Sequence, residues 1–241
     1  MSFLASYTYS HSIDDTSGYE NSSNGSRSTN PYNFATDKGD SAYDARQRFV
    51  ISYDYELPHL SRFWNNVLTR SVLDGWHFAG ITTLQSGFPV LLYDTNYQSL
   101  TCDSYAYYGC WDRPNVVGQS VTYNARNSVL MNGVRGGTTA RNYYYYNPNS
   151  YALSPYRTLG NVGRYNFPGP GINNTDLNLS KRIYLSGSEQ NRLIELRLEG
   201  YNLFNHTQFN LPNGNDYSVN FGRTLGATIG RTVQLGAKFY F

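Results

Sequence analysis

The sequence alternates apolar and polar residues with a period of two in six separate segments. Such alternation is typical of β-strands whose two faces meet different surroundings. The clearest case is Arg46–Leu57, where five apolar residues occupy alternate positions: Phe49, Ile51, Tyr53, Tyr55 and Leu57. The positions between them include Ser52, Asp54 and Glu56, so the opposite face of this strand is polar.

We predict six antiparallel strands from this pattern: Phe3–Ser12, Arg46–Leu57, Trp76–Tyr93, Asn174–Leu185, Arg192–Phe204 and Arg231–Phe241. The third strand contains Gly87 and Pro89, which predict a bulge or an interruption. His77 and Thr82 break its alternation, so the sequence leaves open which of its faces is apolar.

The connections between the strands differ in length in a regular way. Asp14–Ala45, Asp94–Asn173 and Asn205–Gly230 are long, whereas Pro58–Gly75 and Ser186–Asn191 are shorter. Outer-membrane barrels typically have long loops on the extracellular side and short turns on the periplasmic side. If the last strand of this chain ends in the periplasm, all of its long connections lie on the extracellular side, as that pattern requires.

Composition narrows the class of protein further. The chain has 24 Tyr, 12 Phe and 22 Gly but only 15% charged residues. No run reaches the roughly 18 apolar residues of a membrane-spanning helix, which excludes a helical membrane protein. We therefore expect an all-β antiparallel barrel segment, with its apolar face toward lipid and its polar face toward a wet lumen.

A soluble antiparallel sandwich is the alternative reading of the same alternation. Two observations favour the barrel. The loops outweigh a compact core, and five charged residues crowd the polar face of neighbouring strands: Asp176, Arg182, Glu195, Arg197 and Glu199. Aromatic residues also gather near the predicted periplasmic ends, as in the aromatic girdles of barrels: Tyr55, Trp76, Tyr184, Phe239 and Phe241.

The C-terminal segment resembles the signal that outer-membrane proteins present to the barrel assembly machinery. That signal has a polar residue, a glycine two positions later, and hydrophobic residues at alternate positions ending in Phe. Gln234, Gly236, Phe239 and Phe241 occupy these positions. The resemblance implies that this machinery is a partner and receives the last strand by β-augmentation.

Glu199–His206, which reads EGYNLFNH, resembles the E-x-x-N-L-F-N strand near the end of TonB-dependent receptors. Further segments, in the right order, resemble the Oar-like branch of that family, which carries a carboxypeptidase-regulatory-like domain: Leu84–Pro89, Asp112–Gly118, Gly160–Arg164, Gly169–Gly171 and Asp176–Lys181. The resemblance implies a barrel of about 22 strands around an N-terminal plug. It also implies uptake of a scarce solute, driven through TonB.

This chain departs from that pattern because it shows about six strands and no plug. We expect residues 1–241 to be the C-terminal part of such a barrel, which does not transport by itself. The expected partners are outer-membrane lipid and lipopolysaccharide, an unknown small solute, and TonB only through the missing plug. Alternatives are a small stand-alone or adhesive barrel, with extra strands around Val116–Val134 and Phe221–Ile229, and a secreted sandwich.

Motifs for catalysis or cofactors do not stand out. None of the four histidines lies in a nucleophile motif, so we expect no enzyme, no cofactor and no metal site. There is no basic patch with interleaved aromatic residues, so nucleic acid is not an expected partner. Cys102 and Cys110 are predicted to form a disulfide, with two free thiols or half of a metal site as the alternatives.

Aromatic residues of the longest loop are the candidates for ligand contact: Tyr105, Tyr107, Tyr108, Trp111, Tyr143, Tyr144, Tyr145 and Tyr146. Tyr and Trp offer large, rigid contact area that stacks on sugars or planar ligands. The alternative is that these side chains pack on one another above the barrel.

The expected size of the native product is directly measurable. An antibody against the Asp94–Asn173 loop should detect, in outer-membrane fractions, a band several times larger than 27.3 kDa. A single heat-modifiable band at 27.3 kDa would instead indicate a small closed barrel.

Overall fold

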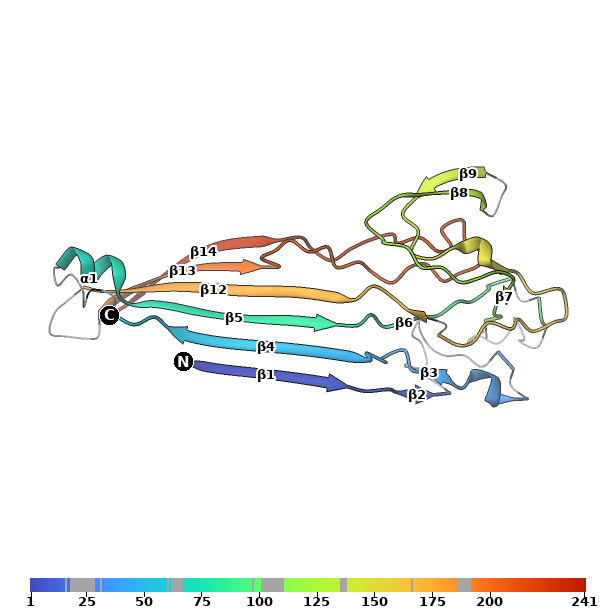
Figure 1. Ribbon diagram of the computed structural model, residues 1–241, viewed down its shortest axis with the longest axis horizontal. Helices are drawn as coiled ribbons and strands as arrows, with labels where there is room; N and C mark the ends of the chain where they lie inside the picture. Colours follow the sequence, from blue (N-terminus) through green and yellow to red (C-terminus); the bar gives the residue numbers. More distant parts are fainter. Residues whose placement is uncertain are drawn as a thin grey trace.

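A computed structural model describes the chain in these ranges: 1–15, 17, 29–30, 32–59, 61, 67–96, 98–100, 111–134, 138–165, 167–185 and 192–241. Six long strands form a single antiparallel sheet, and the shorter elements lie mainly beyond one of its ends (Figure 1). No helix in these ranges is long and apolar enough to cross a membrane.

The strands of the sheet are neighbours in chain order, β1-β4-β5-β12-β13-β14. Their bounds are β1 (Ser2–Tyr9), β4 (Gln47–Glu56), β5 (Trp76–Gln85), β12 (Ile172–Tyr184), β13 (Leu193–Tyr201) and β14 (Thr232–Tyr240). All six predicted strands are confirmed. The third prediction was too long, because β5 ends at Gln85 rather than at Tyr93.

The interruption of the third strand has a clear cause. After Gln85 the chain leaves the main sheet, and β6 (Pro89–Val90) pairs instead with β11 (Phe167–Pro168). Gly169 N donates to Phe88 O over 2.8 Å at this point. A Cβ on Gly87 would overlap the Gly169 carbonyl, so the close approach of the two segments requires glycine.

The register places apolar side chains in continuous rows on one face of the sheet. Tyr55 pairs with Phe78, Phe78 with Leu179, Leu179 with Leu198, and Leu198 with Leu235. These pairs settle the question that the sequence left open, since they put the even-numbered residues of β5 on the apolar face. We expect this face to meet lipid.

Polar side chains interact across the other face. His77 Nε2 lies 2.9 Å from Asp54 Oδ2 on the neighbouring strand. On its other side, His77 Nδ1 lies 3.4 Å from Ser180 Oγ. Farther along the sheet, Arg197 Nε donates to Glu195 Oε1 over 2.5 Å. Hydrogen bonding of this kind fits a wet interior, where polar groups retain partners.

The end of the sheet with the short connections also carries α1 (Val67–Leu73) and the C-terminus (Figure 1). Lys181 lies on the apolar face near this end, and its ammonium group lies 5.3 Å from the centre of the Trp76 ring. Lys181 Nζ also donates a hydrogen bond to Asp74 O. The long side chain therefore covers apolar surface while its ammonium group bonds to a backbone carbonyl at the end of the sheet. The predicted aromatic residues lie at this same end: Tyr55, Trp76, Tyr184, Phe239 and Phe241.

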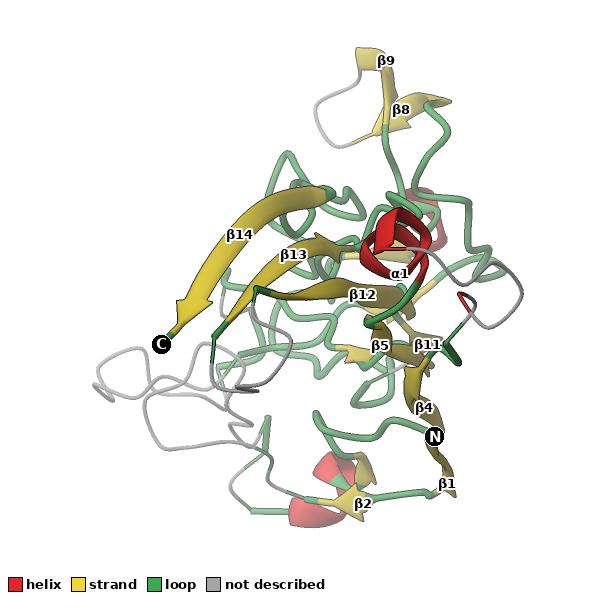
Figure 2. Cartoon of the chain, turned by 90° about the vertical axis from the view of Figure 1, so that its left-hand side faces the viewer, coloured by secondary structure: helices red, strands yellow, loops and turns green. Residues whose placement is uncertain are grey.

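The sheet is curved but not closed (Figure 2). β1 and β14 each pair on one side only, so the described strands form an arc of a barrel. The two extra strands that a small closed barrel needs are absent from this sheet. β7 (Asn115–Val116) and β8 (Val129–Val134) pair elsewhere, with β10 (Tyr151–Ala152) and β9 (Thr138–Asn142), and residues 221–229 form no strand.

An arginine should destabilise the protein when it is placed on the apolar face of β12 but not when it is placed on the polar face. Leu179→Arg puts a charge on the apolar face in the middle of β12 and should destabilise the folded protein by about 2–4 kcal/mol, the cost of Arg at the bilayer midplane. Asn178→Arg, one residue away on the polar face, is the matched control and should be tolerated. The urea concentration that extracts the protein from membranes measures both, and equal losses would contradict the assigned faces.

Candidate functional site

Three long connections, residues 10–46, 86–171 and 202–231, come together at the end of the sheet opposite α1 (Figure 1). We call their described residues the loop layer. It includes the short elements β2 (Ile13–Asp14), η1 (Phe34–Asp37), β3 (Gly39–Asp40) and η3 (Pro148–Ser150). Because residues from all three connections meet here, this layer is the place to look for a site.

The loop layer contains the apolar core of the molecule. Its main cluster consists of six buried residues: Val90, Leu92, Tyr146, Tyr151, Val162 and Phe221. The Tyr146 and Phe221 rings pack edge to face, with centres 5.3 Å apart. Across the described part of the chain, every buried apolar side chain lies in this layer and none lies in the six strands. A soluble sandwich would bury the apolar face of its strands instead.

A buried arginine of the second long connection holds the first one. Arg113 Nη2 donates to Asp37 Oδ1 over 2.6 Å, and Arg113 Nη1 donates to Thr36 O over 2.8 Å. Both charged side chains are almost fully buried. Burial lowers the pKa of the Arg113 guanidinium, and the charge of Asp37 offsets only part of that shift.

A second arginine makes a similar connection. Arg164 Nη1 donates to Asp14 Oδ1 over 2.6 Å, and Arg164 Nη2 donates to Ser17 Oγ over 2.8 Å. Burial acts to raise the pKa of the Asp14 carboxyl. Hydrogen bonds from Ser17 and Ser41 and the charge of Arg164 outweigh burial, so the pKa is lowered. Arg113 and Arg164 belong to segments that carry the family resemblance, and both serve to fix loops to each other.

At the base of the first long connection, Arg46 lies among three possible metal ligands, His11, Asp40 and Asp44. Arg46 Nη2 donates to Asp40 Oδ2 over 2.9 Å, and Arg46 Nε donates to Asp44. Burial acts to raise the pKa of the Asp40 carboxyl, but the hydrogen bonds from His11 and Arg46 leave it lowered. The guanidinium already supplies the positive charge that a metal ion would bring, so we interpret the cluster as an ion-pair network.

The N-L-F-N segment forms the outer turn of β13. Asn202 and Asn205 have φ angles of 51° and 52°, in the left-handed region that Asn tolerates better than most residues. Asn202 N donates to Asp176 Oδ1 over 2.8 Å, and His206 N donates to Asn202 Oδ1 over 2.9 Å. The left-handed backbone at both positions therefore explains why Asn occurs there, and at Asn202 the side chain also stabilises the turn.

The predicted ligand-contact tyrosines fall into different environments. Tyr144 and Tyr146 are 2% and 0% exposed: Tyr146 packs in the main cluster, and Tyr144 packs with Met131 in a second, smaller one. Tyr145 is half-buried, and burial raises the pKa of its phenol. Tyr143 is 55% exposed and faces a cavity. Packing therefore accounts for Tyr144 and Tyr146, and Tyr143 stays a candidate for ligand contact.

Other predicted site residues remain untested. Trp111 stacks on Tyr93 with ring centres 4.2 Å apart. The remaining aromatic candidates and both cysteines lie outside the described residues: Tyr105, Tyr107, Tyr108, Cys102 and Cys110. The predicted assembly signal lies on β14 and beyond it, on a strand with an unpaired outer edge: Gln234, Gly236, Phe239 and Phe241. Its recognition by the assembly machinery stays a prediction.

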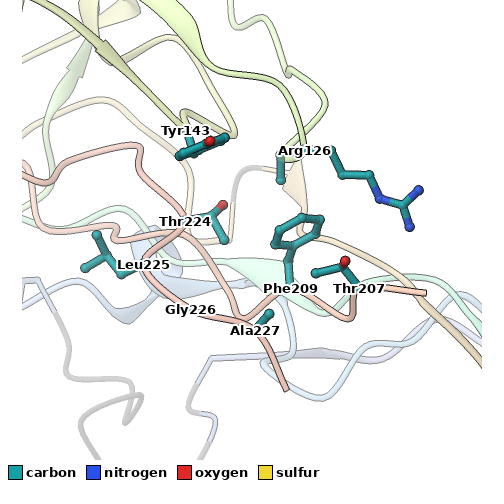
Figure 3. Close-up of a pocket in the computed structure, with 9 residues that line it drawn as sticks. Arg126, Tyr143, Thr207, Phe209, Thr224, Leu225, Gly226 and Ala227 are labelled. Carbon is teal, nitrogen blue, oxygen red and sulfur yellow. The ribbon is translucent and has the colours of Figure 1, made fainter. Parts of the chain in front are cut away.

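Two of the cavities that the described residues form lie in the loop layer. The first cavity has a volume of about 450 Å³ and lies between Ala125, Arg126 and Tyr143 on one side and residues 207–227 on the other (Figure 3). Its lining residues are Ala125, Arg126, Tyr143, Thr207, Phe209, Thr224, Leu225, Gly226 and Ala227. The second, of about 510 Å³, has Tyr93, Tyr165 and Leu211 among its walls. Of all these residues, only Tyr143 was singled out as a ligand contact from the sequence.

Removing one of the buried arginines should release the first long connection. Arg164→Met removes the cationic partner of the Asp14 carboxylate, which keeps its hydrogen bonds from Ser17, and should destabilise the local structure by about 1–3 kcal/mol. Trypsin should then cleave after Lys38 and Arg46 faster than in the wild type. Arg157→Met, which removes an exposed arginine of the same loop, is the control, and equal cleavage of the two variants would contradict the role of Arg164.

Acid should also release the first long connection, residues 10–46, from the rest of the loop layer. The pKa values of Asp14 and Asp40 are lowered below their ordinary value of 3.8 in the folded chain. Their stabilisation is therefore complete above pH 3.8 and is lost as the pH falls through the lower folded-state values. Pepsin digestion between about pH 4.5 and pH 2 should show cleavage of residues 10–46 setting in below pH 3.8. Cleavage that is independent of pH, after correction for pepsin activity, would contradict this.

The comparison with protein families adds the identity of the fold. A family model described as "Outer membrane beta barrel domain" matches residues 1–234. No curated protein and no solved structure matches the chain. The match covers nearly the whole chain and agrees with the antiparallel strands, the apolar outer face and the polar inner face. The chain therefore belongs to the outer membrane β-barrel domain family and lies in the bacterial outer membrane.

Proposed function

We propose that the chain supplies barrel wall and extracellular loops to a TonB-dependent receptor, which takes up a small solute. The observation that carries this proposal is the loop layer itself. Three connections fold together over the outer end of the barrel wall, around their own core and two buried arginines. An ordered surface above a polar lumen suits a protein that must bind a solute before passing it inward.

The resemblance to TonB-dependent receptors supports the same proposal. The segments that carry this resemblance make several of the contacts that hold the loop layer together. Arg113 and Arg164 join the loops, Gly169 meets Phe88, and Asn202 forms the outer turn of β13. In this proposal TonB acts through the plug of the receptor, and residues 1–241 supply no catalytic group.

The alternative is a small stand-alone barrel with a structural or adhesive role. It depends on a sheet that closes with strands from residues 116–134 and 221–229. In the part of the chain that the structure describes, the main sheet receives no strand from either range. No observation therefore favours this alternative over the receptor.

Uptake that depends on membrane energy tests the receptor proposal. Cells with and without the complete gene would be supplied with labelled iron chelates, cobalamin, oligosaccharides and peptides. We expect one class to enter only when the gene is present, and to stop entering when an uncoupler dissipates the proton-motive force. Equal uptake of all classes in both strains, or uptake that survives the uncoupler, would contradict the proposal.

A further inference from the structure

The cavity that Tyr143 faces is formed by two segments that are held together by backbone hydrogen bonds. Thr224 N donates to Tyr143 O over 3.0 Å, and Tyr145 N donates to Gly222 O over 2.8 Å. The second segment is also paired within itself, where Asn210 N donates to Gly226 O over 3.0 Å. The walls of the cavity are therefore fixed by the backbone rather than by side chains alone.

The surface of this cavity is mainly apolar and contains two aromatic rings. In Figure 3 the Tyr143 side chain lies on one side, and Phe209 and Thr224 lie below it. Leu225 and Ala227 extend the apolar surface. Tyr143 and Leu225 are 55% and 58% exposed, which is a large exposed area for apolar side chains in a folded layer. A flat apolar molecule would cover these groups.

One charged group borders the cavity. Arg126 is the only charged residue in its lining, and Figure 3 shows the Arg126 side chain extending away from Tyr143, with the guanidinium beyond the Phe209 ring at the rim. Among the described residues the Arg126 guanidinium has no ion-pair partner, in contrast to the buried Arg113 and Arg164. A guanidinium binds a carboxylate through two parallel hydrogen bonds, which favours an anion over a neutral group.

A polar atom in the floor of the cavity also lacks a partner. Thr224 Oγ1 is buried and makes no hydrogen bond to any group that the structure describes. Figure 3 shows this oxygen on the side of Thr224 that faces Tyr143. A buried hydroxyl without a partner destabilises the protein, so a small side-chain movement that lets it bond to a ligand would be favourable.

We propose that this cavity binds a small molecule with a planar apolar body and one carboxylate. The body lies between Tyr143 and Phe209, and the carboxylate binds the Arg126 guanidinium. The volume of about 450 Å³ is within the range of small-molecule sites. That this molecule is the transported solute rests on the proposed function. The existence of the site rests only on the geometry of the cavity.

Binding of two matched probes tests the site. The probes are 2-naphthoate and its neutral analogue 2-naphthamide, measured by equilibrium dialysis against outer-membrane vesicles that contain the protein. Vesicles without the protein correct for partition into lipid. Naphthoate should bind the wild type more tightly than naphthamide. Arg126→Gln should weaken naphthoate binding at least about tenfold, because the Gln side chain offers a neutral hydrogen bond in place of two charge-assisted ones, and should leave naphthamide binding within about twofold.

Two further variants make the test specific. Tyr143→Ala should weaken the binding of both probes, because it removes one wall of the cavity. Arg141→Gln removes an exposed arginine from the neighbouring strand β9, outside the cavity, and should leave both probes unchanged. Naphthoate binding that is absent, that equals naphthamide binding, or that is unaffected by Arg126→Gln would overturn the proposal.

The outcomes separate the site from the proposed function. Probe binding with the expected variant effects, in a protein whose gene supports no energy-dependent uptake, would retain the site and overturn the receptor. Energy-dependent uptake that the Tyr143→Ala and Arg126→Gln variants leave unchanged, together with no probe binding, would retain the receptor and overturn the site.

Discussion

A backbone N–H or C=O group without a partner costs several kcal/mol in the hydrocarbon core of a membrane, and the fold is organised by that cost. The six long strands satisfy it through one antiparallel ladder in which consecutive strands pair. Because side chains alternate along a strand, the register of the ladder also decides their faces. One continuous apolar face and one polar face follow, and a one-residue shift of any strand would exchange them.

An apolar face directed at lipid leaves the strands without a core to share, and the protein builds its core elsewhere. All buried apolar side chains of the described residues lie in the loop layer, packed around Tyr146 and Phe221. Ion pairs add to this core, since the buried Arg113 and Arg164 side chains are paired with the carboxylates of Asp37 and Asp14. An isolated buried charge is strongly unfavourable, so these pairs specify which loops meet. The layer that results is where we propose the solute site.

The sequence predicted the fold well where the interactions are local. Period-two alternation located all six strands, and Gly87 with Pro89 indicated an interruption within the third one, although the predicted strand ran on to Tyr93 and β5 ends at Gln85. The apolar face of β5 was not predictable, because Ala79 and Ile81 make its polar face partly apolar. Pairing with the neighbouring strands β4 and β12 decides which face is apolar. The loop layer was not predictable for a similar reason: the Arg113–Asp37 contact spans 76 residues and the Arg164–Asp14 contact spans 150. Arg126 and Phe209 carry no local signal, since their cavity exists only when distant segments pair.

The central claim is that the two faces of the sheet meet lipid and water, and spin labels on β13 test it most directly. Single labels at Leu196, Arg197, Leu198 and Glu199 would be introduced after the two native cysteines are replaced by serine. Collision rates with oxygen, which concentrates in lipid, and with a water-soluble nickel chelate report the surroundings of each label. The account predicts high oxygen rates at Leu196 and Leu198 and high nickel rates at Arg197 and Glu199. Rates that do not alternate, or that alternate in the opposite sense, would contradict it.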